Sequence, residues 1–303
     1  MHNLITILGP TAAGKTSLAA KLAALINGEI ISADSRQLYK RMDIGTGKDL
    51  SDYVVDGVSI PYHLIDIVEP GVKYNVFEYM RAFAVAFTSV IDKGKIPIFS
   101  GGSGMYLDAI LSGYELSKVP NDNSLREEMS NLSFDKLIQR LKSYGPLHNI
   151  SDITSDERLY RAIEIAEFQF KNRVSSLEIP EFNSINFGIM YNLDDVRNRI
   201  EKRLIQRIDE GMVDEVKRLI DEGLNPDDLI YYGLEYKFVT NYITGKVNFK
   251  QMYNQLNIAI GQFAKKQMTW FRKMEKKGVK IIWIDGQISE SEKIAFMLSK
   301  LKS

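Results

Sequence analysis

Short apolar runs recur along the chain, each bounded by glycine or polar residues. They cover residues 4–8, 29–33, 96–100, 186–191 and 279–284. Continuous apolar runs of this length are typical of strands that are buried on both faces, as in a parallel sheet. Residues 58–68 mix apolar and polar positions and end at Glu69-Pro70-Gly71, which is typical of an edge element.

Helical periodicity separates most of these runs. Residues 17–26 have an apolar helical pattern, and residues 78–92 place Phe83, Phe87 and Val90 on one side. Residues from 194 onward are also predicted to be helical up to the last apolar run. Strands that alternate with helices predict an α/β fold, with a parallel sheet core flanked by helices.

The pattern changes at about residue 113. Residues 119–123 are linker-like, residues 124–170 are almost wholly helical, and the strand pattern resumes at residues 186–191. A helical block that interrupts an α/β pattern indicates an inserted subdomain. We therefore expect a core formed by residues 1–112 and 183–303, and a mostly helical insertion at residues 113–182.

The first apolar run leads into a glycine-bounded turn that ends in lysine and threonine. Its residues are Gly9, Pro10, Thr11, Ala12, Ala13, Gly14, Lys15 and Thr16. Strand, turn, Lys-Thr and helix in this order predict a P-loop, and an ordinary turn would not need all four residue types in register. The glycines allow backbone N–H groups and a helix N-terminus to converge on a phosphate, where Lys15 adds charge and the Thr16 hydroxyl can bind Mg²⁺.

Two other strand ends carry candidate chemistry. Asp34 follows residues 29–33, and Gly101-Gly102-Ser103-Gly104 follows residues 96–100. Ligands of open α/β sheets bind beyond the carboxyl ends of the strands, so Asp34 and Ser103 are predicted to lie beside the phosphate loop. A helix cap remains the alternative for Asp34, and a flexible turn for the glycine-rich segment. For His63, a packed and hydrogen-bonded side chain is favoured over a catalytic one.

Composition limits the class of protein. Of 303 residues, 45% are hydrophobic and 26% charged, which is ordinary for a globular protein, and the absence of cysteine excludes disulfides and thiolate metal sites. The 39 basic and 39 acidic residues balance, so any nucleic acid must meet local patches such as residues 197–207 and 265–280. A solvated helix face is the alternative for either patch. We find no run long enough to span a bilayer and expect no signal peptide and a cytoplasmic location.

Together these motifs resemble the tRNA dimethylallyltransferases, also called tRNA isopentenyltransferases, from Leu4 to about Trp283. The segments that carry the resemblance are residues 9–16, 32–39, 42–48, 62–66, 101–106, 157–164 and 263–272. The resemblance implies a P-loop NTPase-like fold that uses its phosphate loop for a diphosphate leaving group. It also implies transfer of a dimethylallyl group from dimethylallyl diphosphate to N6 of the adenosine 3′ of the tRNA anticodon, with Mg²⁺ as cofactor.

The resemblance also implies roles for individual residues. Asp34 matches the family's catalytic base, Arg203 matches an arginine that binds the diphosphate with Lys15, and Ser103 stands where the family has a threonine that bonds the bridging oxygen. The residues that match tRNA contacts are Asp34, Ser35, Arg36, Gln37, Ser103, Arg126, Glu157, Arg158, Leu159, Tyr160 and Arg161. The insertion is expected to clamp the anticodon stem-loop of tRNA, and the protein is expected to act as a monomer.

The chain departs from the family's usual pattern in its C-terminal half. Ile260-Gly261-Gln262 replaces Thr-Arg-Gln, Lys266 replaces a common arginine, and Leu234-Glu235 follows Gly233 where Gly-Tyr is usual. These departures concern the C-terminal contacts with tRNA and leave the predicted reaction centre unchanged.

Three other functions are compatible with a P-loop. A small-molecule kinase would use the loop for ATP, but no strand ends in a clear Walker-B aspartate. An adenylate isopentenyltransferase would prenylate a free mononucleotide, which needs no helical clamp. A non-catalytic RNA-binding protein would not require Asp34.

Overall fold

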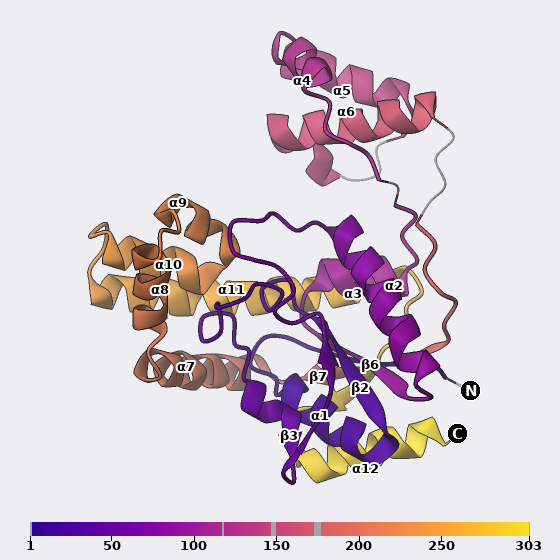
Figure 1. The fold of residues 1–303 in the computed structure, drawn as a ribbon, viewed down its shortest axis with the longest axis vertical. Coiled ribbons are helices and arrows are strands. Elements are labelled where there is room, and N and C mark those ends of the chain that lie inside the picture. Colours follow the sequence, from indigo (N-terminus) through magenta and orange to yellow (C-terminus); the bar gives the residue numbers. More distant parts are fainter. Residues whose placement is uncertain (1, 117, 147–149, 173–176, 303) are drawn as a thin grey trace. The chain divides into compact units, whose positions relative to one another are not determined.

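The computed structural model describes residues 2–116, 118–146, 150–172 and 177–302 (Figure 1). The chain forms two compact units. Residues 1–114 and 179–303 form one unit, called the core here, and residues 115–178 form the other, called the insertion. The sequence-based boundaries at residues 113 and 182 differ from these by only a few residues.

A six-stranded parallel sheet lies at the centre of the core, in the order β5-β2-β6-β1-β7-β8. Its strands are β1 (Leu4–Leu8), β2 (Gly28–Ala33), β5 (Tyr62–His63), β6 (Ile96–Gly101), β7 (Ser184–Met190) and β8 (Ile282–Asp285). The predicted α/β fold is therefore confirmed. The short β5 occupies one edge of the sheet, inside the segment expected to form an edge element.

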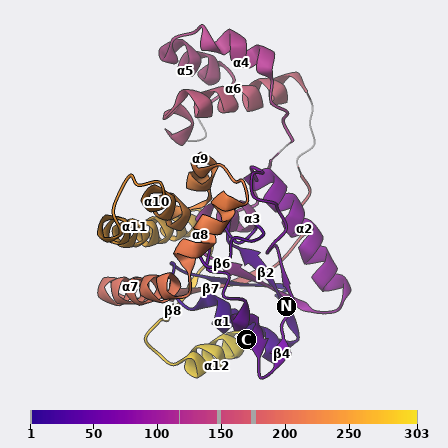
Figure 2. The same cartoon turned by 60° about the vertical axis from the view of Figure 1, so that its left-hand side comes forward.

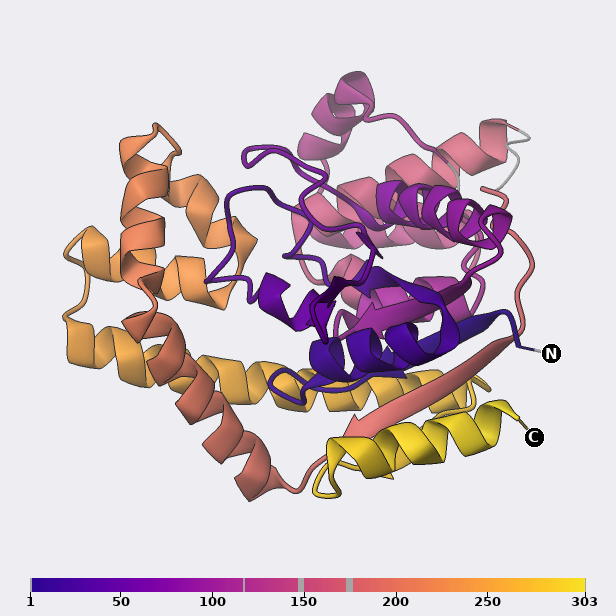
Figure 3. The ribbon, with the colours of Figure 1, turned by 60° about the horizontal axis from the view of Figure 1, so that its bottom comes forward.

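One face of the sheet is covered by α1 (Lys15–Ile26) and α12 (Glu290–Leu301), which contact each other. Figure 3 shows α12 in yellow, next to the C-terminus. Ile5, Ile7 and Ile98 face these helices and share a buried cluster with Leu18 of α1 and Met297 of α12. The helix α12 follows the last strand and was not predicted from the sequence.

The opposite face is covered by α2 (Val76–Asp92), α3 (Gly104–Leu111) and α11 (Phe249–Lys276). Successive side chains of a strand alternate between faces, so Phe99 points away from the side to which Ile98 points. Phe99 contacts Phe83 of α2, with ring centroids 4.9 Å apart. The predicted apolar face of this helix is confirmed, since Phe83, Phe87 and Val90 are all buried.

The remaining core helices lie between β7 and α11 in sequence. They are α7 (Leu193–Asp209), α8 (Met212–Asp221), α9 (Pro226–Leu229) and α10 (Leu234–Ile243). Their apolar side chains Leu204, Val216 and Tyr236 are buried, and α7 and α10 both pack against α11. This packing brings α7 to the P-loop side of the core, as the contacts below show.

The insertion has a hydrophobic core of its own. It contains α4 (Asn123–Ser130), α5 (Phe134–Ser143) and α6 (Asp156–Lys171), with a short 3₁₀ helix at Ile150–Ile153 (Figure 2). Six buried side chains form its core: Leu125, Met129, Leu137, Leu141, Leu159 and Ile163. The three helices therefore stabilise one another without relying on the parallel sheet.

Candidate active site

The predicted site residues follow the carboxyl ends of three neighbouring strands, so they lie at the same end of the sheet. In the order β2-β6-β1, the strands lead into Asp34, Ser103 and the P-loop respectively. The backbone N–H of Ser103 donates to Ala33 O at 3.0 Å, and the Ser103 hydroxyl accepts from the backbone N–H of Ser35 at 2.8 Å. The segment after β2 and the segment after β6 are therefore joined directly.

The P-loop turns through two left-handed residues. Ala12 has φ 60° and Gly14 has φ 76°, a region that favours glycine, and α1 begins immediately afterwards at Lys15. The Lys15 ammonium donates to Pro10 O at 2.7 Å, which closes the loop. The N-terminus of a 12-residue helix therefore opens into the loop, which is the arrangement that suits a phosphate.

Charge is concentrated beside this loop. Burial and the positive charge of Arg203 lower the pKa of Lys15 to about 8, against the opposing effect of the negative charge of Asp34. Arg203 lies on α7 and its guanidinium donates to Asp49 at 2.6 Å. Lys15, Arg203 and Asp34 therefore act on one another electrostatically although they come from three different parts of the chain.

Asp34 is half-buried at the end of β2. Its carboxylate accepts the backbone N–H of Arg36 at 2.9 Å, within a turn rather than at the start of a helix. Asp34 therefore does not cap a helix. It stabilises a local turn, as Asp side chains do when they accept a backbone N–H two residues further on. This bond orients the carboxylate, while its charge acts on Lys15.

Arg36 and Gln37 lie next to Asp34 but differ in exposure. Arg36 is half-buried, its guanidinium donates to Tyr231 O at 2.8 Å, and it lies over the Tyr231 ring. Gln37 is buried, and its amide donates to Gly47 O at 2.9 Å and accepts from the Ser32 hydroxyl. Arg36 can face a large ligand, whereas Gln37 supports the loop behind it.

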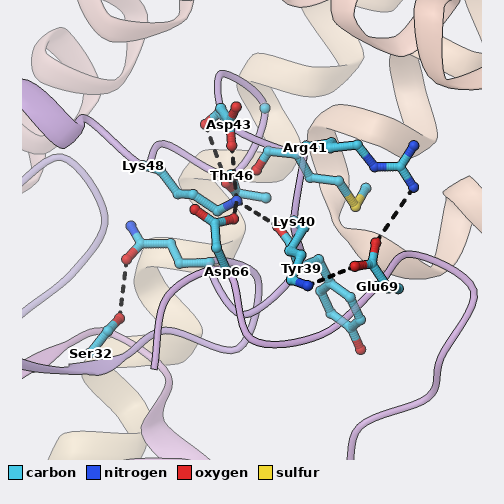
Figure 4. A network of polar contacts seen from close by, with 12 residues as sticks. Ser32, Tyr39, Lys40, Arg41, Asp43, Thr46, Lys48, Asp66 and Glu69 are labelled. Atoms are coloured by element: carbon cyan, nitrogen blue, oxygen red, sulfur yellow. Dashed lines mark hydrogen bonds and ion pairs between the residues drawn. The ribbon is translucent and has the colours of Figure 1, made fainter. Parts of the chain in front are cut away.

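That loop, residues 42–48, is held by a buried lysine (Figure 4). The Lys48 ammonium is fully buried, donates to Tyr39 O, and pairs with Asp66 and with Asp43 at 2.9 Å. A buried charge is stable only when it is paired and hydrogen-bonded, as Lys48 is. Lys48 therefore fixes the loop in one conformation.

A carboxylate from α8 holds the same loop from its other side. Glu215 accepts the backbone N–H groups of Asp43, Ile44 and Gly45 at 2.8, 2.8 and 3.0 Å, and the Tyr236 hydroxyl at 2.7 Å. Four donors on one buried carboxylate form a strong anchor. Since Arg203 pairs with Asp49 just after this loop, Glu215 also helps to determine where that arginine lies.

Gln267 and Arg199 contact the P-loop, and neither contact was predicted from the sequence. Gln267 is buried on α11, accepts the Thr11 N–H at 2.8 Å and donates to Gly102 O at 2.8 Å. Arg199 on α7 donates to Ala12 O at 2.7 Å. Gln267 lies within residues 263–272, one of the segments that resemble the family. A polar residue on the apolar side of that helix could have indicated a buried polar contact.

The predicted tRNA contacts of the insertion fall into two groups. Arg126 and Arg161 both pair with the buried carboxylate of Glu164, at 2.6 and 3.0 Å, and Arg161 also donates to Val119 O at 2.8 Å. Leu159 is fully buried in the insertion's core, and Tyr160 is half-buried. Glu157 and Arg158 are exposed near the start of α6. The exposed pair and the partly exposed arginines are the side chains that can meet a ligand.

His63 lies away from this cluster. Its imidazole shares a 2.7 Å hydrogen bond with Glu29, a buried carboxylate that also pairs with Lys93 and Lys95. The packed, hydrogen-bonded interpretation of His63 therefore matches the structure. Among the described residues, no helix is both long and apolar enough to cross a membrane.

A metal at this site would have few protein ligands. Within the described residues, no group of three or more His, Cys, Asp or Glu side chains could hold a metal ion. Mg²⁺ usually binds through one or two protein groups and keeps waters and phosphate oxygens as its other ligands. Thr16, on the first turn of α1, fits that arrangement.

Comparison with known proteins identifies the family. The model of the IPP transferase family matches residues 37–274, well over half of the chain. This chain belongs to the IPP transferase family. It is 52% identical to "tRNA dimethylallyltransferase 2" of Bacteroides fragilis over 301 residues, which covers 99% of this chain and 98% of that one.

Solved structures of the IPP transferase family have the same fold. The full-length tRNA isopentenylpyrophosphate transferase of Bacillus halodurans superposes with a TM-score of 0.71 at 27% identity, over 100% of this chain and 96% of that chain. A eukaryotic dimethylallyltransferase described as acting on tRNA has a TM-score of 0.80 at 19% identity, over 100% and 80% of the two chains. The second likeness concerns the fold alone.

Proposed function

We propose that this IPP transferase transfers a dimethylallyl group from dimethylallyl diphosphate to N6 of the adenosine 3′ of the tRNA anticodon, releasing diphosphate. One observation supports this proposal most directly: the P-loop, the cations Lys15 and Arg203 and the carboxylate of Asp34 lie together at the carboxyl ends of the strands. The membership of the chain in a family of tRNA dimethylallyltransferases supports the choice of substrates. We further propose that the enzyme is a cytoplasmic monomer.

Asp34 is the proposed base. The exocyclic amine of adenine is a weak nucleophile, so a carboxylate within hydrogen-bond reach must take its proton as the new C–N bond forms. Asp34 already acts on Lys15, which belongs to the phosphate loop, so the amine can lie between the base and the leaving group. The bond between the prenyl carbon and the diphosphate oxygen breaks in the same step.

The P-loop and its cations are proposed to stabilise the leaving diphosphate. Negative charge grows on the oxygen that departs, and donors aimed at that oxygen lower the barrier. Lys15 and Arg203 supply charge, and Ser103 supplies a hydroxyl that the Ser35 N–H already orients. Mg²⁺, when bound through Thr16 and the diphosphate, would supply further charge neutralisation.

The insertion is proposed to bind the anticodon stem-loop of tRNA. A target base must leave its stack to enter an enclosed site, so the enzyme also needs contacts that hold the rest of the RNA. The exposed Arg158 and the partly exposed Arg126 and Arg161 offer charge for phosphate contacts. Arg36 and Ser35, beside Asp34, are proposed to contact the unpaired loop.

The test is an incubation of the protein with dimethylallyl diphosphate, Mg²⁺ and tRNA that lacks the modification, followed by mass spectrometry of its nucleosides. The expected product is N6-dimethylallyladenosine at the position 3′ of the anticodon. Prenylation of free AMP in preference to tRNA would instead indicate an adenylate isopentenyltransferase. ATP-dependent phosphorylation of a small molecule, with no prenylated nucleoside, would indicate a kinase.

A further inference from the structure

A small pocket lies between the P-loop and α7. The residues that line it are Thr11, Ala12, Ile200, Arg203, Leu204, Arg207, Glu235 and Ile260. Its apolar walls come from α7 and α11, while its charged groups are two guanidiniums and one carboxylate. Arg203 is already a proposed ligand of the diphosphate, whereas Arg207 and Glu235 have no role in the mechanism above.

Arg207 is buried but incompletely bonded. Its side chain is 8% exposed and lies 3.5 Å from the Glu235 carboxylate through one terminal nitrogen. Its Nε has no hydrogen-bond partner among the residues that the structure describes. A buried donor without a partner is costly, so an unused guanidinium N–H at a pocket wall indicates a missing acceptor.

Positive charge also converges here. The Nη2 atoms of Arg207 and Arg203 lie 1.7 and 2.7 Å from the position that a Cβ on Gly47 would occupy, so both guanidiniums occupy the space that a side chain there would need. Burial and the charge of Arg203 lower the pKa of Arg207, and burial and the same charge lower that of Lys15. Three cations in a confined space repel one another until an anion joins them.

The nearby carboxylates balance this charge only in part. Asp49 pairs with Arg203 at 2.6 Å, but Glu235 stays 3.5 Å from Arg207. Burial raises the pKa of Glu235, and the positive charge of Arg207 opposes that effect. The Arg207 guanidinium therefore keeps a buried N–H that none of the described carboxylates accepts.

We propose that Arg207 is a further ligand of the substrate diphosphate, held in place by Glu235 and completing a three-cation site with Lys15 and Arg203. The inference rests on the proposed function, which supplies the diphosphate. It also gives a role to Glu235, which lies in the segment where the sequence departs from the usual family pattern. The apolar side chains Ile200, Leu204 and Ile260 surround the charges and would strengthen the contact by excluding water.

A purely structural pair is the competing explanation. In that case Arg207 and Glu235 would only join α7 to α10, and removing Arg207 would lower stability without changing anion affinity. Binding of an isolated anion separates the two explanations, because a structural pair has no direct contact with it.

The experiment is calorimetric titration of the full-length protein with inorganic pyrophosphate in the presence of Mg²⁺. Arg207→Met should weaken pyrophosphate binding by about tenfold or more, as expected when a charge-assisted contact is lost. Arg218→Met is the matched control, because Arg218 is an exposed arginine of α8 that does not line the pocket. It should bind pyrophosphate within about twofold of the wild type. A folded Arg207→Met variant with wild-type pyrophosphate affinity would overturn the proposal.

A second variant covers the case in which Arg207→Met does not fold. Arg207→Lys keeps a cation opposite Glu235 but loses the planar fork that binds phosphate through two nitrogens. It should bind pyrophosphate about threefold more weakly or worse, and unchanged affinity would overturn the proposal. Failure of the proposed function would be recognised separately, as wild-type protein that binds pyrophosphate but prenylates no tRNA.

Discussion

The lowered pKa of Lys15 predicts that substrate binding depends on pH. Lys15 is half-buried in the P-loop, and burial together with Arg203 lowers its pKa to about 8. A bound diphosphate favours the charged ammonium, so dimethylallyl diphosphate should bind mainly to the protonated form. As pH rises through 8, the fraction of protein with a charged Lys15 falls and the apparent affinity falls with it.

The size of the effect follows from that pKa. Protonated Lys15 makes up about nine-tenths of the protein at pH 7 and about one-tenth at pH 9, so the apparent Kd should rise about tenfold between them. A lysine with an ordinary pKa near 10.4 would change the Kd by only a few per cent over the same range. Burial raises the pKa of the nearby Tyr53, so that phenol does not titrate in this range.

The assay is equilibrium binding of dimethylallyl diphosphate at constant Mg²⁺ from pH 7 to pH 9. The last phosphate ionisation, with a pKa of about 6, lies below this range and its residual effect would strengthen binding as pH rises, opposite to the predicted weakening. Lys15→Met is the control: it should bind more weakly at pH 7 and change little with pH. A wild-type Kd that stays constant, or an equal tenfold rise in Lys15→Met, would refute the reasoning.

Protein stability should respond in the opposite direction. The charged form of Lys15 is disfavoured in the folded protein, so its cost is present below pH 8 and is lost as pH rises towards 10.5. Relative to Lys15→Met, the free energy of unfolding of the ligand-free wild type should therefore increase between pH 8 and pH 10. A decrease over that interval would contradict the assignment.

Three further predictions concern Asp34, Glu215 and Arg161. Asp34→Asn should lower single-turnover prenylation by about 10²–10⁴-fold while the Kd for tRNA stays nearly constant, and normal turnover would mean that the base lies elsewhere. Glu215→Ala should destabilise the protein by about 3–5 kcal/mol in chemical denaturation, since four donors lose one buried carboxylate, and a loss below about 1 kcal/mol would contradict that role. Arg161→Ala should raise the Kd for tRNA with little change in the Kd for pyrophosphate. Unchanged tRNA affinity would mean that Arg161 does not bind tRNA and only joins α6 to residues 119–121 through hydrogen bonds.

The sheet and the P-loop could be predicted because their signals are local. The apolar runs at residues 4–8, 29–33 and 96–100 form strands of the central sheet. A strand that is covered on both faces needs apolar side chains at nearly every position, so a continuous apolar run predicts it. The conformation of the loop at residues 9–16 depends mainly on residues within the loop itself. The position of Asp34 and Ser103 followed from a general rule about strand ends in parallel sheets.

The supporting residues could not be predicted in this way. Gln267 meets Thr11 across 256 positions of the sequence, Arg199 meets Ala12 across 187, and Glu215 meets Asp43 across 172. No local pattern encodes such contacts, because they depend on how helices pack around the sheet. The same reason explains why Leu159, within a segment that resembles a tRNA contact, lies in the core of the insertion.

The central claim is that the P-loop of this protein holds a leaving diphosphate rather than ATP. The most direct test follows dimethylallyl diphosphate that carries a radioactive phosphorus, with tRNA and Mg²⁺ and without ATP. The account predicts that labelled pyrophosphate appears in one-to-one proportion with prenylated adenosine. Release of labelled orthophosphate, or a requirement for ATP before any adenosine is prenylated, would contradict it.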